Sequence, residues 1–216
     1  MPLKILALLF TFSLMTTGCS KMYLSSLESI GIAKRDVMVH RVKKARDTQE
    51  ETKEQFQTAL EQFTSLTHYD GGDLGKIYKK LNNEYLASVD QAEEVNKRIN
   101  DIESVSSALF TEWEAELQEY SSASLRNKSK RQLRSTKNQY KQLIAAMRSA
   151  ESKMQPVLQI FKDQVLYLKH NLNAQAISSL KGELSGIESN VSSLIAAMEQ
   201  SINEANAFIV TIEKKN

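Results

Sequence analysis

Apolar residues recur along this chain at alternating spacings of three and four, from about Ala33 almost to the C-terminus. An α-helix completes a turn every 3.6 residues, so this spacing puts the apolar side chains on one face. Sustained over many turns, it forms the heptad seam of helices that pack as in a coiled coil. The pattern therefore predicts an all-α fold built from long helices.

Three interruptions divide the pattern into four helices. The first is His68–Asp73, where paired glycines tolerate positive φ and Asp73 can cap the next helix. The second is Ser121–Ser124, and the third is His170–Asn173, where the apolar spacing slips. We expect the first helix to end near Leu66 and the second to reach about Tyr120. Pro156 predicts a kink or a restart in the third helix, because proline lacks the backbone donor.

Four helices with short turns predict an elongated antiparallel four-helix bundle with coiled-coil-like packing and both termini at one end. Each helix should span roughly 60–70 Å at 1.5 Å per residue. The alternative is a three-helix rod in which Val157–Ile212 forms one helix. The most regular seam, on the second helix, should be buried core, and Trp113 on it should pack against another helix. Its positions are Leu74, Tyr78, Leu81, Tyr85, Ser88, Ala92, Val95, Ile99, Ile102, Ser106, Leu109 and Trp113.

Composition agrees with helices: the chain has 7 Gly and 2 Pro in 216 residues, and a net charge of +2. The charges are segregated, however. Acidic residues dominate from Asp90 to Glu119, and every charge from Leu125 to Arg148 is basic. Folding back at Ser121–Ser124 should lay the two blocks side by side, so we expect pairing between them and no nucleic-acid binding. The alternative is that the basic block binds phosphates, lipid headgroups or nucleic acid.

The N-terminus has the features of an export signal. Lys4 precedes an apolar run from Ile5 to Met15, which is too short to span a bilayer. Gly18 and Cys19 follow, and Cys19 is the chain's one cysteine. This stretch resembles the lipobox of bacterial lipoproteins, although Thr16 stands where leucine is usual. That resemblance implies lipid attachment at Cys19, a signal peptide over 1–18, a membrane-proximal linker over 19–32 and a bundle domain over 33–216.

No catalytic motif accompanies the helices. The sequence contains no GxxxxGK[ST], HExxH or GxSxG, and its three histidines are scattered: His40, His68 and His170. We therefore expect no enzyme activity, no metal site and no cofactor. By resemblance to lipoprotein sorting, Ser20 after the cysteine favours the outer membrane.

Across nearly all of the mature part, the chain resembles a bacterial family known as domain of unknown function 2959. The resemblance lies in residues 50–63, DGG at 70–72, LNNEY at 81–85, and the runs 108–126, 140–151 and 168–180. It implies a helical envelope protein without an assigned activity. We expect an outer-membrane lipoprotein that serves as a periplasmic scaffold or binding protein with an unidentified protein partner. The alternative is a cytoplasmic coiled-coil protein associated with nucleic-acid maintenance.

Overall fold

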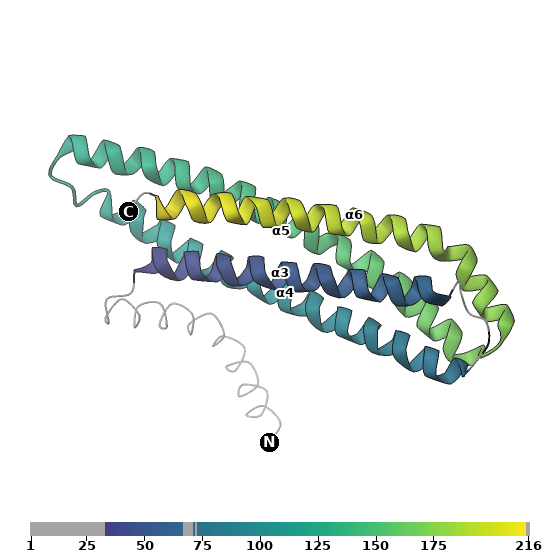
Figure 1. Cartoon of the computed structure of the whole chain (residues 1–216). Helices are drawn as coiled ribbons and strands as arrows, with labels where there is room; N and C mark the ends of the chain where they lie inside the picture. Colours follow the sequence, from purple (N-terminus) through teal and green to yellow (C-terminus); the bar gives the residue numbers. More distant parts are fainter. Residues whose placement is uncertain (1–32, 67–70, 72, 215–216) are drawn as a thin grey trace, which may run out of the picture.

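The computed structural model of the chain describes residues 33–66, 71 and 73–214, and these residues form helices and turns without a strand. The described residues form four long helices, whose arrangement is drawn in Figure 1. They are α3 (Lys34–Ser65), α4 (Leu74–Glu116), α5 (Ala123–His170) and α6 (Ala174–Glu213).

The helices run alternately up and down, and each packs against two others (Figure 1). α3 lies between α4 and α6, and α5 also packs against both of these helices. The predicted antiparallel four-helix bundle is therefore confirmed, and the three-helix alternative is wrong. The break between α5 and α6 occurs because Asn171 leaves the helical region, at φ −132° and ψ 62°. Asn173 then caps α6 by accepting a hydrogen bond from the Ala176 amide at 3.0 Å.

Cap residues also begin the helices after the other two turns, and Asp73 is the cap that the sequence predicted. Asp73 accepts hydrogen bonds from the amides of Gly75 and Lys76 at 2.9 and 3.3 Å. Gly71 lies at φ +119°, a conformation that favours glycine. Ser122 caps α5 through the Leu125 amide. α4 ends at Glu116, short of the expected Tyr120, because the chain enters a turn at Leu117.

Pro156 does not restart the third helix, since α5 continues through it. The ring removes the hydrogen bond to the Ser152 carbonyl, four residues earlier. Both residues lie on the exposed face of α5, so water can hydrate that carbonyl. The buried face carries Met154, Val157 and Leu158 past the proline without interruption.

The apolar seams form one continuous core. Phe161 of α5 stacks on Phe63 of α3, with ring centroids 4.8 Å apart. A polar contact lies in the same interior, where Ser201 of α6 donates to Gln49 of α3 at 2.7 Å. Such a buried polar pair helps to define helix register. Several buried residues lie outside the predicted seams, beside a seam or in the helix turns before it: Met38, Val39, Val42, Val105, Phe110, Leu158, Ile177 and Ile209.

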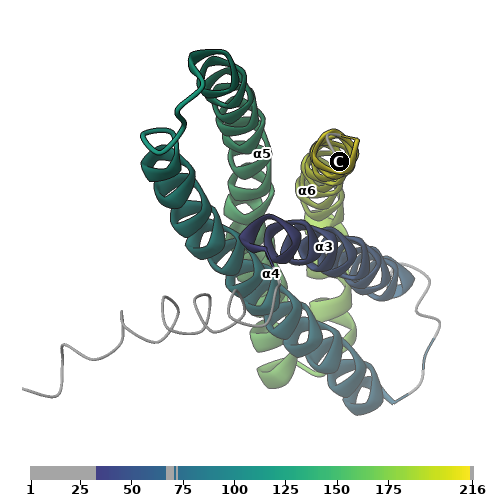
Figure 2. The same cartoon turned by 90° about the vertical axis from the view of Figure 1, so that its left-hand side faces the viewer.

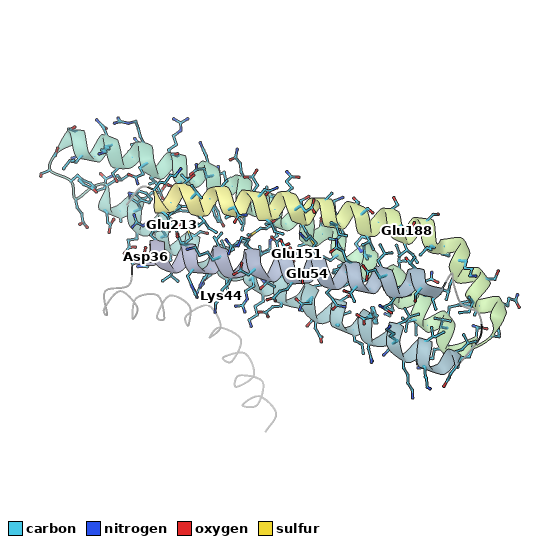
Figure 3. The ribbon with its side chains drawn as sticks, viewed as in Figure 1. Asp36, Lys44, Glu54, Glu151, Glu188 and Glu213 are labelled. Atoms are coloured by element: carbon cyan, nitrogen blue, oxygen red, sulfur yellow. The ribbon has the colours of Figure 1, made fainter. Side chains whose placement is uncertain are left out.

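The helices differ in length more than expected. α3 has 32 residues and spans about 48 Å, below the predicted range, while α5 has 48 residues and spans about 72 Å. The α4–α5 hairpin therefore outreaches its neighbours at one end. Figure 3 shows that Asp36 of α3 and Glu213 of α6 also lie at this end.

Candidate anion-binding surface

The hairpin of α4 and α5 projects beyond α3 and α6. Lys34, the first residue of α3, donates to Glu112 of α4 at 3.0 Å. Gln139 of α5 donates to Thr211, near the end of α6, at 3.3 Å. Residues 113–138 lie between these two contacts, and we call them the tip. Figure 2 views this end of the molecule and shows the tip separated from α3 and α6.

Within the tip, α4 and α5 hold each other. The Trp113 indole donates to the Ser129 hydroxyl at 2.7 Å, and Leu117 and Leu133 are buried between the helices. At the base of the tip, the rings of Phe110 and Tyr140 pack edge to face, with their centroids 5.4 Å apart. Burial raises the pKa of Tyr140, while a hydrogen bond with Ser106 opposes this shift.

Trp113 contacts another helix, as predicted, but it is only partly buried. The prediction of a buried tryptophan is wrong because α3 begins, and α6 ends, short of the level of Trp113 along the bundle. Its seam position is the same as that of the buried residues nearer the middle of α4, and only the number of covering helices differs.

Basic side chains follow one face of α5 through the tip and one turn past its base. Arg126, Lys130, Arg134, Lys137 and Lys141 are spaced by four, four, three and four residues. At 100° per residue these positions fall within an arc of about 80°. We call this set the cationic stripe. Lys137 is partly buried and the other four residues are exposed. Lys128 and Arg131 lie on a different face of the same helix and are also exposed.

The predicted pairing of the acidic and basic blocks is confined to two basic residues. Lys137 reaches Glu114 of α4 at 2.5 Å and lies 5.4 Å from the centre of the Phe110 ring. Arg148, farther along α5, contacts Glu103 at 2.5 Å and Glu151 at 2.8 Å. The hydrogen bond with Glu103 is the main cause that raises the pKa of Arg148.

The other basic residues of the block make no ion pair within the described part of the chain: Arg126, Lys128, Lys130, Arg131, Arg134 and Lys141. The expectation of block-wide neutralisation is therefore wrong. The carboxylates of α4 find other partners: Glu112 pairs with Lys34, and Glu94 pairs with Arg98 at 2.5 Å. The two blocks are also offset, because α5 continues beyond the end of α4.

A groove of about 320 Å³ runs between the stripe and the end of α4. Its lining combines four cations of the stripe with one carboxylate: Lys130, Arg134, Lys137, Lys141 and Glu114. Leu117 and Leu133 form its apolar floor. A second, more open hollow of about 490 Å³ includes Lys128 and Arg131. Both suit anionic groups, since several exposed cations converge with few competing carboxylates.

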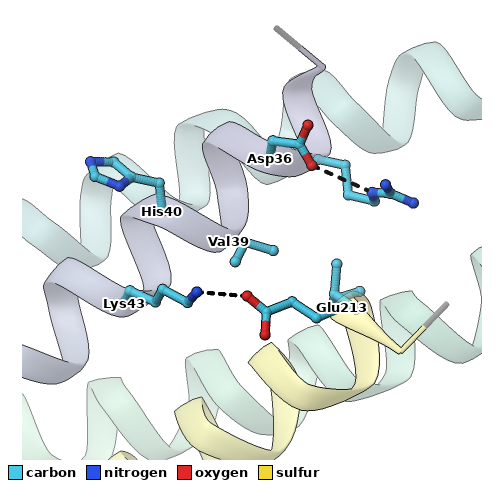
Figure 4. Close-up of a pocket in the computed structure, with 7 residues that line it drawn as sticks. Asp36, Val39, His40, Lys43 and Glu213 are labelled. Atoms are coloured by element: carbon cyan, nitrogen blue, oxygen red, sulfur yellow. Dashed lines mark hydrogen bonds and ion pairs between the residues drawn. The ribbon is translucent and has the colours of Figure 1, made fainter. Parts of the chain in front are cut away.

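A different hollow, of about 260 Å³, lies where α3 begins and α6 ends (Figure 4). Here the charges satisfy one another: Lys43 contacts Glu213 at 2.6 Å, and Arg35 lies 3.8 Å from Asp36. His40 lies beside them and is exposed. This arrangement joins the first and last helices, and it offers an incoming anion fewer unpaired cations than the stripe does.

The structure does not reach the predicted lipid-attachment residue, since Cys19 lies outside the described residues, as does His68. His40 and His170 lie at opposite ends of the bundle and do not come together. Among the residues that are described, no three His, Cys, Asp or Glu side chains form a group that could hold a metal ion. None of the described helices is long and apolar enough to cross a bilayer.

The family profile described as "Protein of unknown function (DUF2959)" matches residues 23–212, nearly the whole chain. The chain belongs to the DUF2959 family. Neither the curated proteins nor the solved structures include a match to it. The family assigns no activity, so the role of this DUF2959 protein has to be argued from its own side chains.

Proposed function

We propose that this DUF2959 protein is an envelope lipoprotein, anchored through Cys19 to the outer membrane and facing the periplasm. Its helical bundle acts as a non-enzymatic scaffold or binding protein. The observation that carries the proposal is the apolar run that ends in Gly18 and Cys19, the one cysteine of the chain. Acyl chains on that cysteine would contribute roughly 0.8 kcal/mol per buried methylene, enough to anchor a water-exposed bundle.

The arrangement of the bundle supports this role. α3 begins at the end of the rod from which the tip projects, so an N-terminal anchor would orient the long axis away from that point (Figure 1). The core fills the interior with apolar side chains, and the charged residues face outward. A rod with this distribution suits binding by its surface, and we expect a protein partner.

The test of the anchor is metabolic labelling with a clickable palmitate analogue, in wild type and in Cys19→Ala. We expect label in the wild-type protein and none in the variant, and we expect the labelled protein in the outer-membrane fraction. Equal labelling of both proteins would end the lipoprotein assignment. A Ser20→Ala variant is the matched control, because it alters the neighbouring residue and keeps the thiol.

The unpaired cations of the tip favour a second candidate, a cytoplasmic coiled-coil protein associated with nucleic acid. An alkaline phosphatase fusion after Lys21 separates the two, because that enzyme is active only after export. Activity comparable to that of a known exported fusion supports the envelope assignment. An inactive but stable fusion supports the cytoplasmic candidate.

A further inference from the structure

We propose that the tip docks onto the headgroups of anionic phospholipids, through the cationic stripe and the neighbouring Lys128 and Arg131. The direction of docking, toward the membrane that holds the N-terminus, rests on the proposed lipid anchor. The affinity of the tip for anionic headgroups does not depend on it. The ligand is the phosphate-bearing surface itself, so a row of exposed cations is sufficient and no enclosed pocket is needed.

The charge of this region carries the argument. Residues 113–141 hold seven basic side chains and three carboxylates, an excess of four positive charges, although the whole chain has a net charge of only +2. Six of the seven make no ion pair within the described residues. Clusters of four to eight Lys and Arg are the usual recognition element for anionic lipid surfaces. The stripe and the second hollow supply that number on one short stretch of helix.

The apolar and aromatic side chains of the tip favour a membrane over a nucleic acid. Leu125, in the first turn of α5, is 55% exposed and lies next to Arg126 and near Lys128. An exposed leucine among cations suits the interface of headgroups and acyl chains, where apolar and basic side chains bind together. The aromatic residues of the tip, Trp113 and Tyr120, are partly buried against the core, and so are poorly placed to stack on bases.

The position of the tip agrees with docking. α3 begins at the same end of the rod as the tip, where its first residue, Lys34, contacts Glu112 of α4 (Figure 1). The fourteen residue-to-residue steps from Cys19 to Ala33 can extend at most about 50 Å. A tether of that length keeps the tip near the bilayer, and the high effective concentration lets modest charge attraction hold it there.

The experiment measures binding of the full chain to vesicles, in a Cys19→Ala background that carries no acyl chain. The probes are vesicles of phosphatidylcholine alone and vesicles that contain phosphatidylglycerol. The test variant replaces Lys130, Arg134 and Lys141 by glutamine, since all three are exposed and unpaired. The matched control replaces Lys162, Lys169 and Lys181 by glutamine, which removes three exposed charges near the opposite end. Circular dichroism checks that each variant stays helical.

We expect binding to the anionic vesicles that weakens as salt rises, and at least about tenfold weaker binding by the test variant. The control should bind as the parent does. Any attraction through the apolar N-terminus and Lys4 is common to the parent and both variants, so the difference between the test variant and the control isolates the tip. Equal losses in both variants, or equal binding to both vesicle types, would overturn the proposal. So would displacement of the chain from anionic vesicles by duplex DNA at a lower phosphate concentration than added phosphatidylglycerol requires. If the palmitate label fails but the anionic vesicles still bind, the anchor falls and the docking surface stands.

Discussion

At the scale of single residues, the environment of a side chain depends on how many helices cover it. Phe161 is fully buried, and it stacks on Phe63 at 4.8 Å and on Phe56 at 6.1 Å. Trp113 occupies an equivalent seam position, yet it is only partly buried, and its indole donates a hydrogen bond to Ser129 of α5. The cost of removing each ring should follow this difference, because it grows with the apolar surface that the ring buries.

We predict that Phe161→Ala lowers the free energy of unfolding by about 3–5 kcal/mol, the usual range for a buried aromatic ring. Trp113→Ala should cost less than about 3 kcal/mol, since part of the indole is already in water. Urea denaturation followed by circular dichroism measures both. Leu166→Ala, at a side chain that is 44% exposed, is the control and should stay within about 0.5 kcal/mol of wild type. A larger loss for Trp113→Ala than for Phe161→Ala would contradict the two-helix environment of the tip.

At the scale of the helices, the first part of α6 contains two glycines, which are poor helix formers. Gly182 and Gly186 both lie within it, and each glycine in a helix costs up to about 1 kcal/mol relative to alanine. A methyl group built at either position would meet no atom within 4 Å. The backbone of α6 therefore accepts alanine at both places without steric conflict.

We predict that Gly182→Ala and Gly186→Ala each raise the free energy of unfolding by about 0.5–1 kcal/mol. The gain comes from the unfolded chain, which loses conformational freedom when alanine replaces glycine. Gly71→Ala is the control with the opposite sign, because φ of +119° strains any residue with a side chain. Thermal unfolding of the three variants measures the effects, and a lower melting temperature for either α6 variant would show that its methyl group meets an obstacle.

At the scale of the whole molecule, the structure has two parts that differ in how many helices pack together. All four described helices surround the interior as far as the contact of Gln139 with Thr211, and of these helices only α4 and α5 continue beyond it. The tip is held by few buried apolar residues, chiefly Leu117 and Leu133. Local opening free energies follow the density of buried contacts, so the tip should open more readily than the bundle.

Hydrogen–deuterium exchange can test this division. We predict that amides of residues 125–130 exchange at least about tenfold faster than amides of residues 143–168 on the same helix. A tenfold difference corresponds to an opening free energy about 1.4 kcal/mol lower. Anionic vesicles should slow exchange at the tip alone, if it docks as proposed. Uniform protection along α5 without vesicles would contradict the two-part description.

The local features of this protein could be predicted from the sequence. Heptad spacing defined the seams, and Asp73 and the interruptions at Ser121–Ser124 and His170–Asn173 marked three helix starts, because caps and apolar faces depend on residues within one or two turns. The end of α4 was expected four residues too late, since a turn at Leu117 leaves little trace in an apolar pattern. Pro156 was expected to kink or restart α5, but α5 continues through it, because the proline lies on the exposed face and leaves the packing of the buried face intact.

Only the tertiary structure decided which charges are paired. In sequence, the acidic and basic blocks look complementary, but an ion pair needs two side chains within about 4 Å, and that distance depends on how far each helix extends. α3 is shorter than α5, and the last turn of α4 places only Glu114 beside the stripe, so Lys130, Arg134 and Lys141 face a groove with a single carboxylate. The same offset in length leaves Trp113 half covered. The candidate site arises from the unequal ends of four helices, a property that no local pattern contains.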